Sequence, residues 1–135
     1  MSQQYQPHPH WIYRCEIQRN TDTLYIYADD LTEKAHKGQA EECAGEPNTR
    51  SIPTAIWCCR TGDAQFRDSF FTGGGYVQGF IDDAFFSIEI IKHSYGKIHI
   101  LPKIGRGCSE LYVKAPLTYA YLLSRLQQID PKYKG

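Results

Sequence analysis

The sequence predicts a single α/β domain in which a mostly parallel or mixed sheet carries helices on its faces, giving three layers. Three observations predict this class. The chain has 135 residues, which suits one domain with one hydrophobic core. Short segments rich in Ile and Tyr alternate with segments whose apolar residues have helical spacing. Glycine-containing turns join several of these segments.

The domain is expected to span residues 11–135, after a flexible N-terminal tail. Two prolines alternate with histidines within residues 1–10, which favours an extended backbone. Residues 11–17, "WIYRCEI", have the composition of an edge strand, and residues 23–30, "TLYIYADD", form the stronger strand candidate.

The next segment, residues 31–44, is predicted to be a helix with one face of small residues, ended by Gly45. Residues 50–57 form a short apolar run that contains Pro53, so a strand there is short or lies at an edge. Residues 58–80 are predicted to be an irregular loop. The stretch "FFTGGGYVQGF" within it contains four glycines, and the aromatic residues of the loop either anchor it or cover a ligand.

The second half of the chain repeats the alternation. Residues 82–96 are predicted to be an amphipathic helix, followed by a buried parallel strand over residues 97–102. A second amphipathic helix is predicted over residues 115–130, with Pro116 in its first turn. The predicted apolar stripes are Phe85, Ile88, Ile91 and Tyr95 in the first helix, and Tyr119, Leu122, Leu126 and Ile129 in the second.

Charge and hydropathy narrow the function classes. The chain has 15 basic and 15 acidic residues and a formal net charge of zero, which argues against a general nucleic-acid-binding protein. No apolar run approaches the length of a membrane span, and the polar N-terminus does not have the pattern of a signal peptide. We therefore expect a cytoplasmic protein without membrane contact.

The five cysteines are odd in number and contain no CxxC pair, so we expect reduced thiols that pack as small apolar residues. A zinc site built from Cys43, Cys58, Cys59 and a histidine is the alternative, but the usual ligand spacing is missing. The sequence therefore predicts no metal site and no cofactor.

Candidate site residues follow the predicted strands, since ligands of open α/β sheets bind beyond the carboxyl ends of the strands. Asp29 and Asp30 end one strand and either hydrogen-bond a ligand or cap the next helix. The segment "PKIGRGC" ends another and contains Lys103 and Arg106. Its glycines form either a phosphate cradle or a tight turn, and both interpretations stay open. Cys108 is a candidate for a thiol of lowered pKa near a helix N-terminus.

The order of four motifs, "GQA", "GEPN", "IPT" and "IGRG", resembles a small family of mostly uncharacterised phage and bacterial proteins. Its members read roughly GGQA, GEPN, GIPT and PxIGxG, and the match covers about residues 23–123. That family is similar in its order of parts to a divergent macro domain, the module that binds ADP-ribose and related nucleotides. Asp29 matches the family's aspartate, whereas Asp30, Ala28, Ala35 and Lys37 depart from its asparagine and glycines.

The resemblance implies a nucleotide clasped by two glycine-containing loops. The expected ligand is ADP-ribose or another NAD-derived nucleotide. Hydrolysis, if it occurs, would use Asp29 or Asp30 to orient water. The alternative is a non-enzymatic phage or bacterial module that sequesters a signalling nucleotide or binds a host protein. The expected ligand-binding residues are Gly38, Gln39 and Ala40 in the first loop, and Lys103, Ile104, Gly105, Arg106, Gly107 and Cys108 in the second.

Overall fold

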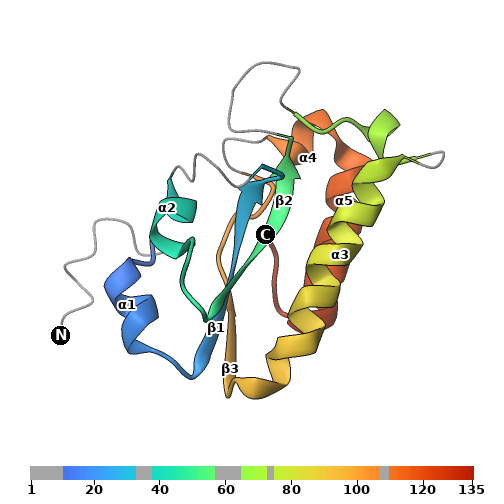
Figure 1. The fold of residues 1–135 in the computed structure, drawn as a ribbon. Coiled ribbons are helices and arrows are strands. Elements are labelled where there is room, and N and C mark those ends of the chain that lie inside the picture. The colour runs from blue at the N-terminus through green and yellow to red at the C-terminus, as the bar shows by residue number, and fades with distance from the viewer. Residues whose placement is uncertain (1–10, 33–37, 57–64, 73–74, 107–109) are drawn as a thin grey trace.

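The computed structural model describes residues 11–32, 38–56, 65–72, 75–106 and 110–135. The predicted tail therefore lies outside the described residues. Figure 1 shows the elements in chain order. They are α1 (Arg14–Arg19), β1 (Thr23–Asp30), α2 (Gln39–Cys43), β2 (Thr49–Ala55), the 3₁₀ turn η3 (Asp68–Phe70), α3 (Tyr76–Ile91), the 3₁₀ turn η4 (Lys92–Ser94), β3 (Lys97–Ile100), α4 (Leu111–Lys114) and α5 (Pro116–Ile129).

The three described strands form one parallel sheet in the order β2-β1-β3, so β1 is central. Tyr25 of β1 is paired with Thr49 of β2 and with His99 of β3. The register shifts between Asp29 and Asp30, where β1 ends. All three strands run in the same direction, and their carboxyl ends share one edge of the sheet (Figure 1).

Helices cover both faces of the sheet (Figure 1), as the sequence predicts. Successive side chains of a strand point to opposite faces. Leu24 and Ile26 accordingly join the core under α3 and α5, and Tyr25 and Tyr27 join a smaller core under α1 and α2. The predicted α/β class with three layers is confirmed.

The prediction of an edge strand over residues 11–17 is wrong, because the chain forms helix α1 from Arg14. A strand-type composition misleads here because α1 buries only Ile17 and owes its position to tertiary contacts. The Arg14 guanidinium donates to the carbonyl oxygens of Glu41 (2.7 Å) and Ala44 (2.9 Å), which lie at the end of α2.

The middle helix begins earlier than predicted, at Tyr76 instead of residue 82. Val77 and Ile81 extend the buried stripe of Phe85 and Ile88 by two more positions. Gly79 suggested a loop, yet it lies inside α3, where a Cβ would meet nothing within 4 Å. The cost of about 1 kcal/mol for a helical glycine is therefore outweighed by the burial of this stripe.

The described part of the segment 58–80 is anchored on the domain by its own side chains. Gln65 forms a bridge with Ala55 at the end of β2, and Phe66 is fully buried. The Asp68 carboxylate accepts hydrogen bonds from the Leu117 and Thr118 N–H groups (3.2 and 2.9 Å) at the start of α5. This carboxylate therefore caps α5 from outside the helix.

β3 is parallel, as predicted, but it ends at Ile100 and lies at an edge of the sheet with Lys97 and His99 exposed. The prediction of a buried strand is wrong because the apolar residues of β3 lie on one face of the sheet only. Helix α5 is confirmed, with Pro116 as its first residue and Leu122 and Leu126 fully buried.

The predicted helix over residues 31–44 is shorter in the described region, where α2 begins at Gln39. Leu31 and Thr32 follow β1 without helical geometry, and residues 33–37 lie outside the described residues. Among the described helices, none has the length and apolar character needed to cross a membrane.

Candidate functional site

Two of the predicted site segments follow strands at the carboxyl edge of the parallel sheet. Asp29 and Asp30 end the central strand β1, and the segment 101–106 follows β3. Gly38 lies directly before α2, on the side of the sheet covered by α1 and α2. Gly107 and Cys108 lie outside the described residues.

Asp29 and Asp30 are the buried acidic pair at this edge, with only 8% and 6% of their surface exposed. The Asp29 Oδ1 accepts the N–H of Asp30 at 2.8 Å, and the Asp30 Oδ1 accepts the Thr32 hydroxyl at 2.5 Å. The helix-capping alternative does not describe α2, since Gly38 is its N-cap. Open α/β sheets bind ligands beyond the carboxyl ends of their strands, so two carboxylates at the end of the central strand favour a ligand-facing role.

In the first predicted loop, Gly38 has a φ of +65°, a conformation that favours glycine. The side-chain amide of Gln39 is used inside the protein. Its Nε2 donates to the carbonyl of Ile12 (2.6 Å), and its Oε1 accepts the N–H of Ile12 (3.0 Å). Ala40 is buried in the core under α1 and α2. Gln39 and Ala40 therefore hold the segment before α1 on the sheet, and Gly38 is the residue of this trio left at the loop.

The second predicted loop begins as a tight turn packed on the C-terminal residues. The buried N–H of Ile104 donates to the Tyr133 hydroxyl (3.2 Å), and that hydroxyl donates to the carbonyl of Leu101 (2.9 Å). The N–H of Arg106 donates to the Lys103 carbonyl at 2.9 Å and closes the turn. Burial raises the pKa of Tyr133, and the bond from Ile104 partly offsets this rise.

Gly105 is required in this turn on two grounds. Its φ is +84°, and a Cβ at this position would lie 2.9 Å from Cδ1 of Tyr119. The described part of the glycine segment, which ends at Arg106, is therefore a tight turn. This agrees with the tight-turn interpretation of the sequence. Lys103 and Arg106 are its exposed cations, and the Arg106 guanidinium lies 4.8 Å from the centre of the Tyr112 ring.

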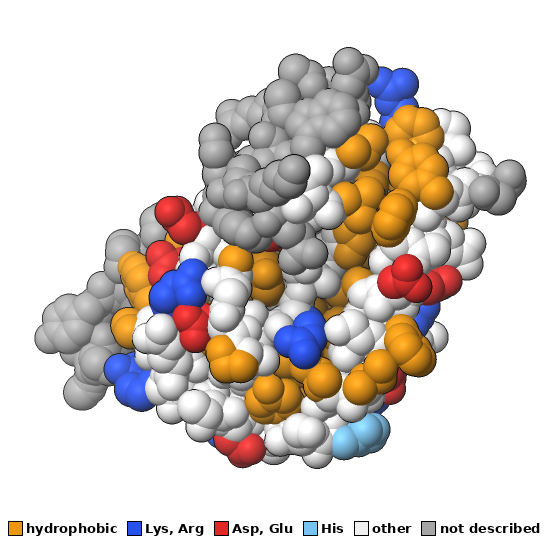
Figure 2. Space-filling view, viewed as in Figure 1, with side chains coloured by type: hydrophobic (Ala, Val, Ile, Leu, Met, Phe, Trp, Pro, Cys, Tyr) orange, Lys and Arg blue, Asp and Glu red, His pale blue; other side chains and the backbone are white. Residues whose placement is uncertain are grey.

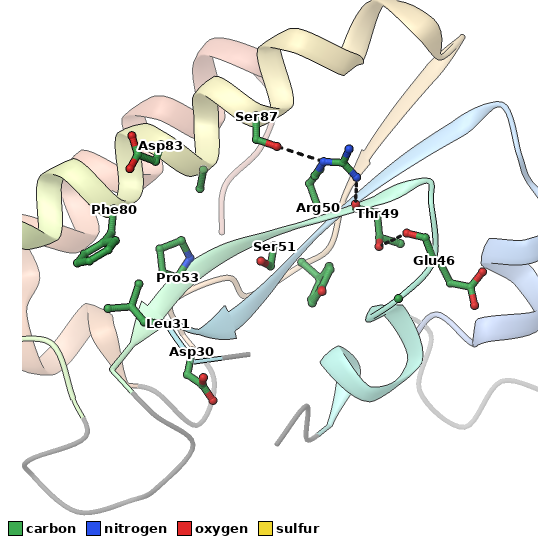
Figure 3. A pocket seen from close by; sticks show the side chains of 13 residues that line it. Asp30, Leu31, Glu46, Thr49, Arg50, Ser51, Pro53, Phe80, Asp83 and Ser87 are labelled. Atoms are coloured by element: carbon green, nitrogen blue, oxygen red, sulfur yellow. Dashed lines mark hydrogen bonds between the residues drawn. The ribbon is translucent and has the colours of Figure 1, made fainter. Parts of the chain in front are cut away.

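A hollow of about 550 Å³ runs from Asp30 along the outer edge of β2. At one end Leu31, Pro53 and Phe80 lie close together above Asp30 (Figure 3). Arg50 spans the middle, where its Nε donates to the Ser87 hydroxyl of α3 at 3.2 Å. The full lining is Tyr27, Asp30, Leu31, Gly45, Glu46, Thr49, Arg50, Ser51, Pro53, Phe80, Asp83, Ala84 and Ser87.

Of the predicted site residues that the structure describes, Asp30 alone lines this hollow. Arg50 is not among the predicted site residues because no motif marks it. Phe80 belongs to the aromatic residues of the segment 58–80 that were expected either to anchor the loop or to cover a ligand, although it was assigned to a loop and not to a helix. The available signal was Pro53, which places β2 at an edge and so leaves room beside it.

The motif "GEPN" has a structural role. The amide nitrogen of Asn48 lies 3.0 to 3.1 Å from three carbonyl oxygens, those of Ile17, Asn20 and Thr23. Glu46 forms an ion pair with Arg14 at 2.5 Å. These contacts fix α1 and the start of β1, so they position the sheet without facing its carboxyl edge.

The buried thiol of Cys43 packs under α1 and α2, and burial raises its pKa to about 12. Such a thiol stays protonated at neutral pH and is a poor metal ligand. Within the described ranges, no three His, Cys, Asp or Glu side chains are grouped closely enough to hold a metal ion.

A family model matches residues 7–125, which include every described strand and most of α5. The chain belongs to the family of unknown function DUF7831. No curated protein and no solved structure shows significant similarity to the chain.

Proposed function

We propose that this DUF7831 protein binds an NAD-derived nucleotide, with ADP-ribose as the expected ligand, at the carboxyl edge of its sheet. The observation that carries the proposal is the buried pair Asp29 and Asp30 at the end of the central strand. Parallel sheets bind ligands at this edge, and carboxylates there accept hydrogen bonds from ribose hydroxyls or a base amino group.

The surrounding residues suit a molecule that has both polar and anionic groups. Asp30 opens into the hollow beside β2, where Leu31 and Phe80 supply apolar surface. Lys103 and Arg106 are exposed at the end of β3 and supply positive charge for a diphosphate. Because the N–H of Ile104 is already bonded to Tyr133, the side chains take the larger share of anion recognition in the described turn.

The two aspartates differ in what they can do. Asp29 accepts the backbone N–H of Asp30 and so holds the strand end in place. Asp30 lines the hollow and is the better candidate to touch the ligand. If the nucleotide is hydrolysed, Asp30 would orient the attacking water, with Asp29 as a positioning residue. We place this function in the cytoplasm, where the unpaired thiols of Cys15 and Cys43 stay reduced.

A second candidate function is a non-enzymatic module that binds a protein. Phe86 and Ile90 of α3 are 66% and 62% exposed, and Tyr76 and Phe80 of the same helix are also exposed. Figure 2 shows apolar side chains gathered over the upper part of α3 on this face. Exposed apolar patches of this kind favour a protein contact.

Thermal melting against ADP-ribose, NAD, ATP and inorganic phosphate tests the proposal. A ligand at about 100 times its Kd adds roughly 2.7 kcal/mol and raises the melting temperature by several degrees. We expect a rise with ADP-ribose that the variant Asp30→Asn loses, while Asp83→Asn, at the far side of the hollow, keeps most of it. No rise with any nucleotide would refute the proposal. Chromatography of the ligand after incubation then separates hydrolysis from simple binding.

A further inference from the structure

The outer edge of β3 presents backbone groups that no other described strand uses. The N–H of Lys97 donates to Asp22 (3.2 Å) and that of Leu101 to Ile26 (2.9 Å), so residues 97, 99 and 101 face β1. By the alternation of a parallel ladder, the N–H and C=O groups of Ile98 and Ile100 point away from β1. In the described part of the chain, no hydrogen bond reaches these four groups from another segment.

The opposite edge of the described sheet, formed by β2, is protected against the addition of another strand. The outer edge of β3 differs from it in this respect. In β2 the residues that face away from β1 include Pro53, which has no N–H to donate. The Arg50 side chain donates to the carbonyl of Thr49 at 2.7 Å on the same edge. Gln65 pairs with Ala55 at the end of the strand. Proline, a covering arginine and a local bridge all discourage strand addition to β2.

Five cations lie on β3 or on segments that adjoin its carboxyl end. Lys97 begins the strand, and Lys103 and Arg106 follow it in the turn. Lys132 and Lys134 flank Tyr133, whose hydroxyl is bonded to Leu101 and Ile104. All five cations are exposed, and none forms an ion pair with another described residue.

Three carboxylates lie near the ends of the same rim, and each is engaged with the backbone. Glu16 accepts the N–H of Tyr13 at 3.3 Å, Asp22 that of Gly96 at 3.0 Å, and Asp130 that of Lys132 at 3.1 Å. These bonds leave the negative charges in place, but the five cations still outnumber the three carboxylates although the whole chain is neutral.

We propose that the outer edge of β3 binds an extended acidic segment of another protein, which adds to the sheet as a strand. The outward N–H and C=O groups of Ile98 and Ile100 would form main-chain hydrogen bonds with the segment. The five cations would select acidic side chains along it. The main-chain contacts of this site lie on β3 upstream of the turn, and only Lys103 and Arg106 are shared with the proposed nucleotide site.

Two other occupants fit the observations less well. A second copy of the chain would bring its own Lys97 and Lys132 against the same cations, and like charges repel. A nucleic acid would satisfy the cations but has no alternating donors and acceptors to pair with a strand edge. An acidic polypeptide satisfies both the charge and the backbone.

The full chain is titrated with a fluorescent probe peptide, acetyl-VEVEVEV-amide, whose strand-forming sequence is acidic on one face. Two control peptides separate the contributions, one with lysine in place of glutamate and one with its three central amides N-methylated. We expect the acidic peptide to bind, the lysine peptide not to bind, and N-methylation to weaken binding at least tenfold. Addition of salt weakens the complex, as it does for charge-steered association.

Variants locate the contact. Lys132→Glu combined with Lys134→Glu is expected to weaken peptide binding at least tenfold, whereas Arg50→Glu, on the opposite edge, changes it less than twofold. Ile98→Pro removes an outward N–H without removing a bond to β1, so it abolishes binding in a folded protein. Backbone NMR of the unaltered protein is expected to show the amide signals of Ile98 and Ile100 shifting with the peptide and exchanging more slowly.

Several results would overturn the proposal. Equal binding of the N-methylated peptide shows attraction by charge alone. Tighter binding of an oligothymidylate that leaves the amide signals of Ile98 and Ile100 unmoved assigns the rim to nucleic acid. A dimer in sedimentation that protects these amides without peptide assigns the edge to a second copy. Absence of binding by the acidic peptide refutes strand addition outright.

Discussion

Asn48 is expected to be the most stabilising polar side chain among the contacts described above, although it faces no ligand. Its buried amide nitrogen serves the carbonyls of Ile17, Asn20 and Thr23 at 3.0 to 3.1 Å. This amide has two N–H hydrogens to share among the three carbonyls, and the Asn20 carbonyl also accepts the N–H of Thr23 at 3.0 Å. Asn48→Ala therefore leaves two acceptors, the carbonyls of Ile17 and Thr23, without this donor. Each unsatisfied buried group costs about 1–3 kcal/mol, and partial relaxation reduces the sum, so we expect a loss of roughly 2–4 kcal/mol.

The free energy of unfolding is measured by urea denaturation, with thermal melting as a second readout. For a domain of this size the loss corresponds to a fall of roughly 8–15 °C in the melting temperature. Gln18→Ala is the matched control, since its amide makes one exposed hydrogen bond to Glu46 at 3.1 Å. That control is expected to lose no more than about 0.5 kcal/mol. If Asn48→Ala unfolds within 0.5 kcal/mol of the unaltered protein, the reasoning that this amide holds α1 on the sheet fails.

Three further predictions concern single side chains. Tyr133→Phe removes the hydroxyl that joins two backbone groups of the turn after β3. We expect the free energy of unfolding to fall by about 1–3 kcal/mol in denaturation experiments. An unchanged denaturation midpoint would contradict this. A maleimide at neutral pH is expected to label the exposed Cys15 quickly and Cys43 only on unfolding, since burial raises the pKa of Cys43 to about 12. Mass spectrometry of the digested protein measures the labelling of each cysteine. Early labelling of Cys43 would count against its burial. The His99 side chain is exposed on one side, but its ring lies 5.4 Å from the Tyr25 ring, and partial desolvation lowers the pKa of His99 below its ordinary value of 6.5. The unfolded chain therefore binds this proton more readily, and stability falls as the pH drops from 6.5 through the lower folded value. His99→Gln should lose this component, and denaturation curves of equal pH dependence for both proteins would refute it.

The fold class could be predicted because its signals are local and repeated. Tyr- and Ile-rich β1 reads as a strand, and Pro116 with Leu122 and Leu126 reads as a helix in any context. Pro53 indicated an edge strand, and β2 is one. These patterns arise from burial and from restriction of the backbone, and both are visible in the residue types and spacing of one segment alone.

The errors occurred where tertiary contacts decide. Residues 14–19 form a helix because Arg14 reaches the end of α2, a contact between residues far apart in sequence. Gly79 lies inside α3 because the stripe of Val77 and Ile81 outweighs a glycine's poor helix propensity. β3 was expected to be buried, and no local pattern shows that the sheet ends there.

The candidate site could be predicted only in part. The position of Asp29 and Asp30 at the carboxyl edge follows from the strand order, and the structure places them there. The internal use of Gln39 and the packing of Gly105 on Tyr119 involve partners far away in the chain, so the motifs alone do not reveal them. The hollow beside β2 depends on how α3 packs next to that strand. The helix predicted from the sequence begins at residue 82 and is therefore too short, since α3 begins at Tyr76.

The position of bound ADP-ribose is the most direct measure of the proposed nucleotide site. Backbone NMR spectra of the ¹⁵N-labelled protein are recorded while ADP-ribose is added. We expect the amide signals of Asp29, Asp30, Gly38 and Arg106 to move together with one dissociation constant, because these residues surround the carboxyl edge of the sheet. Spectra that stay unchanged, or changes confined to the exposed face of α3, would contradict the assignment of a nucleotide site to this edge.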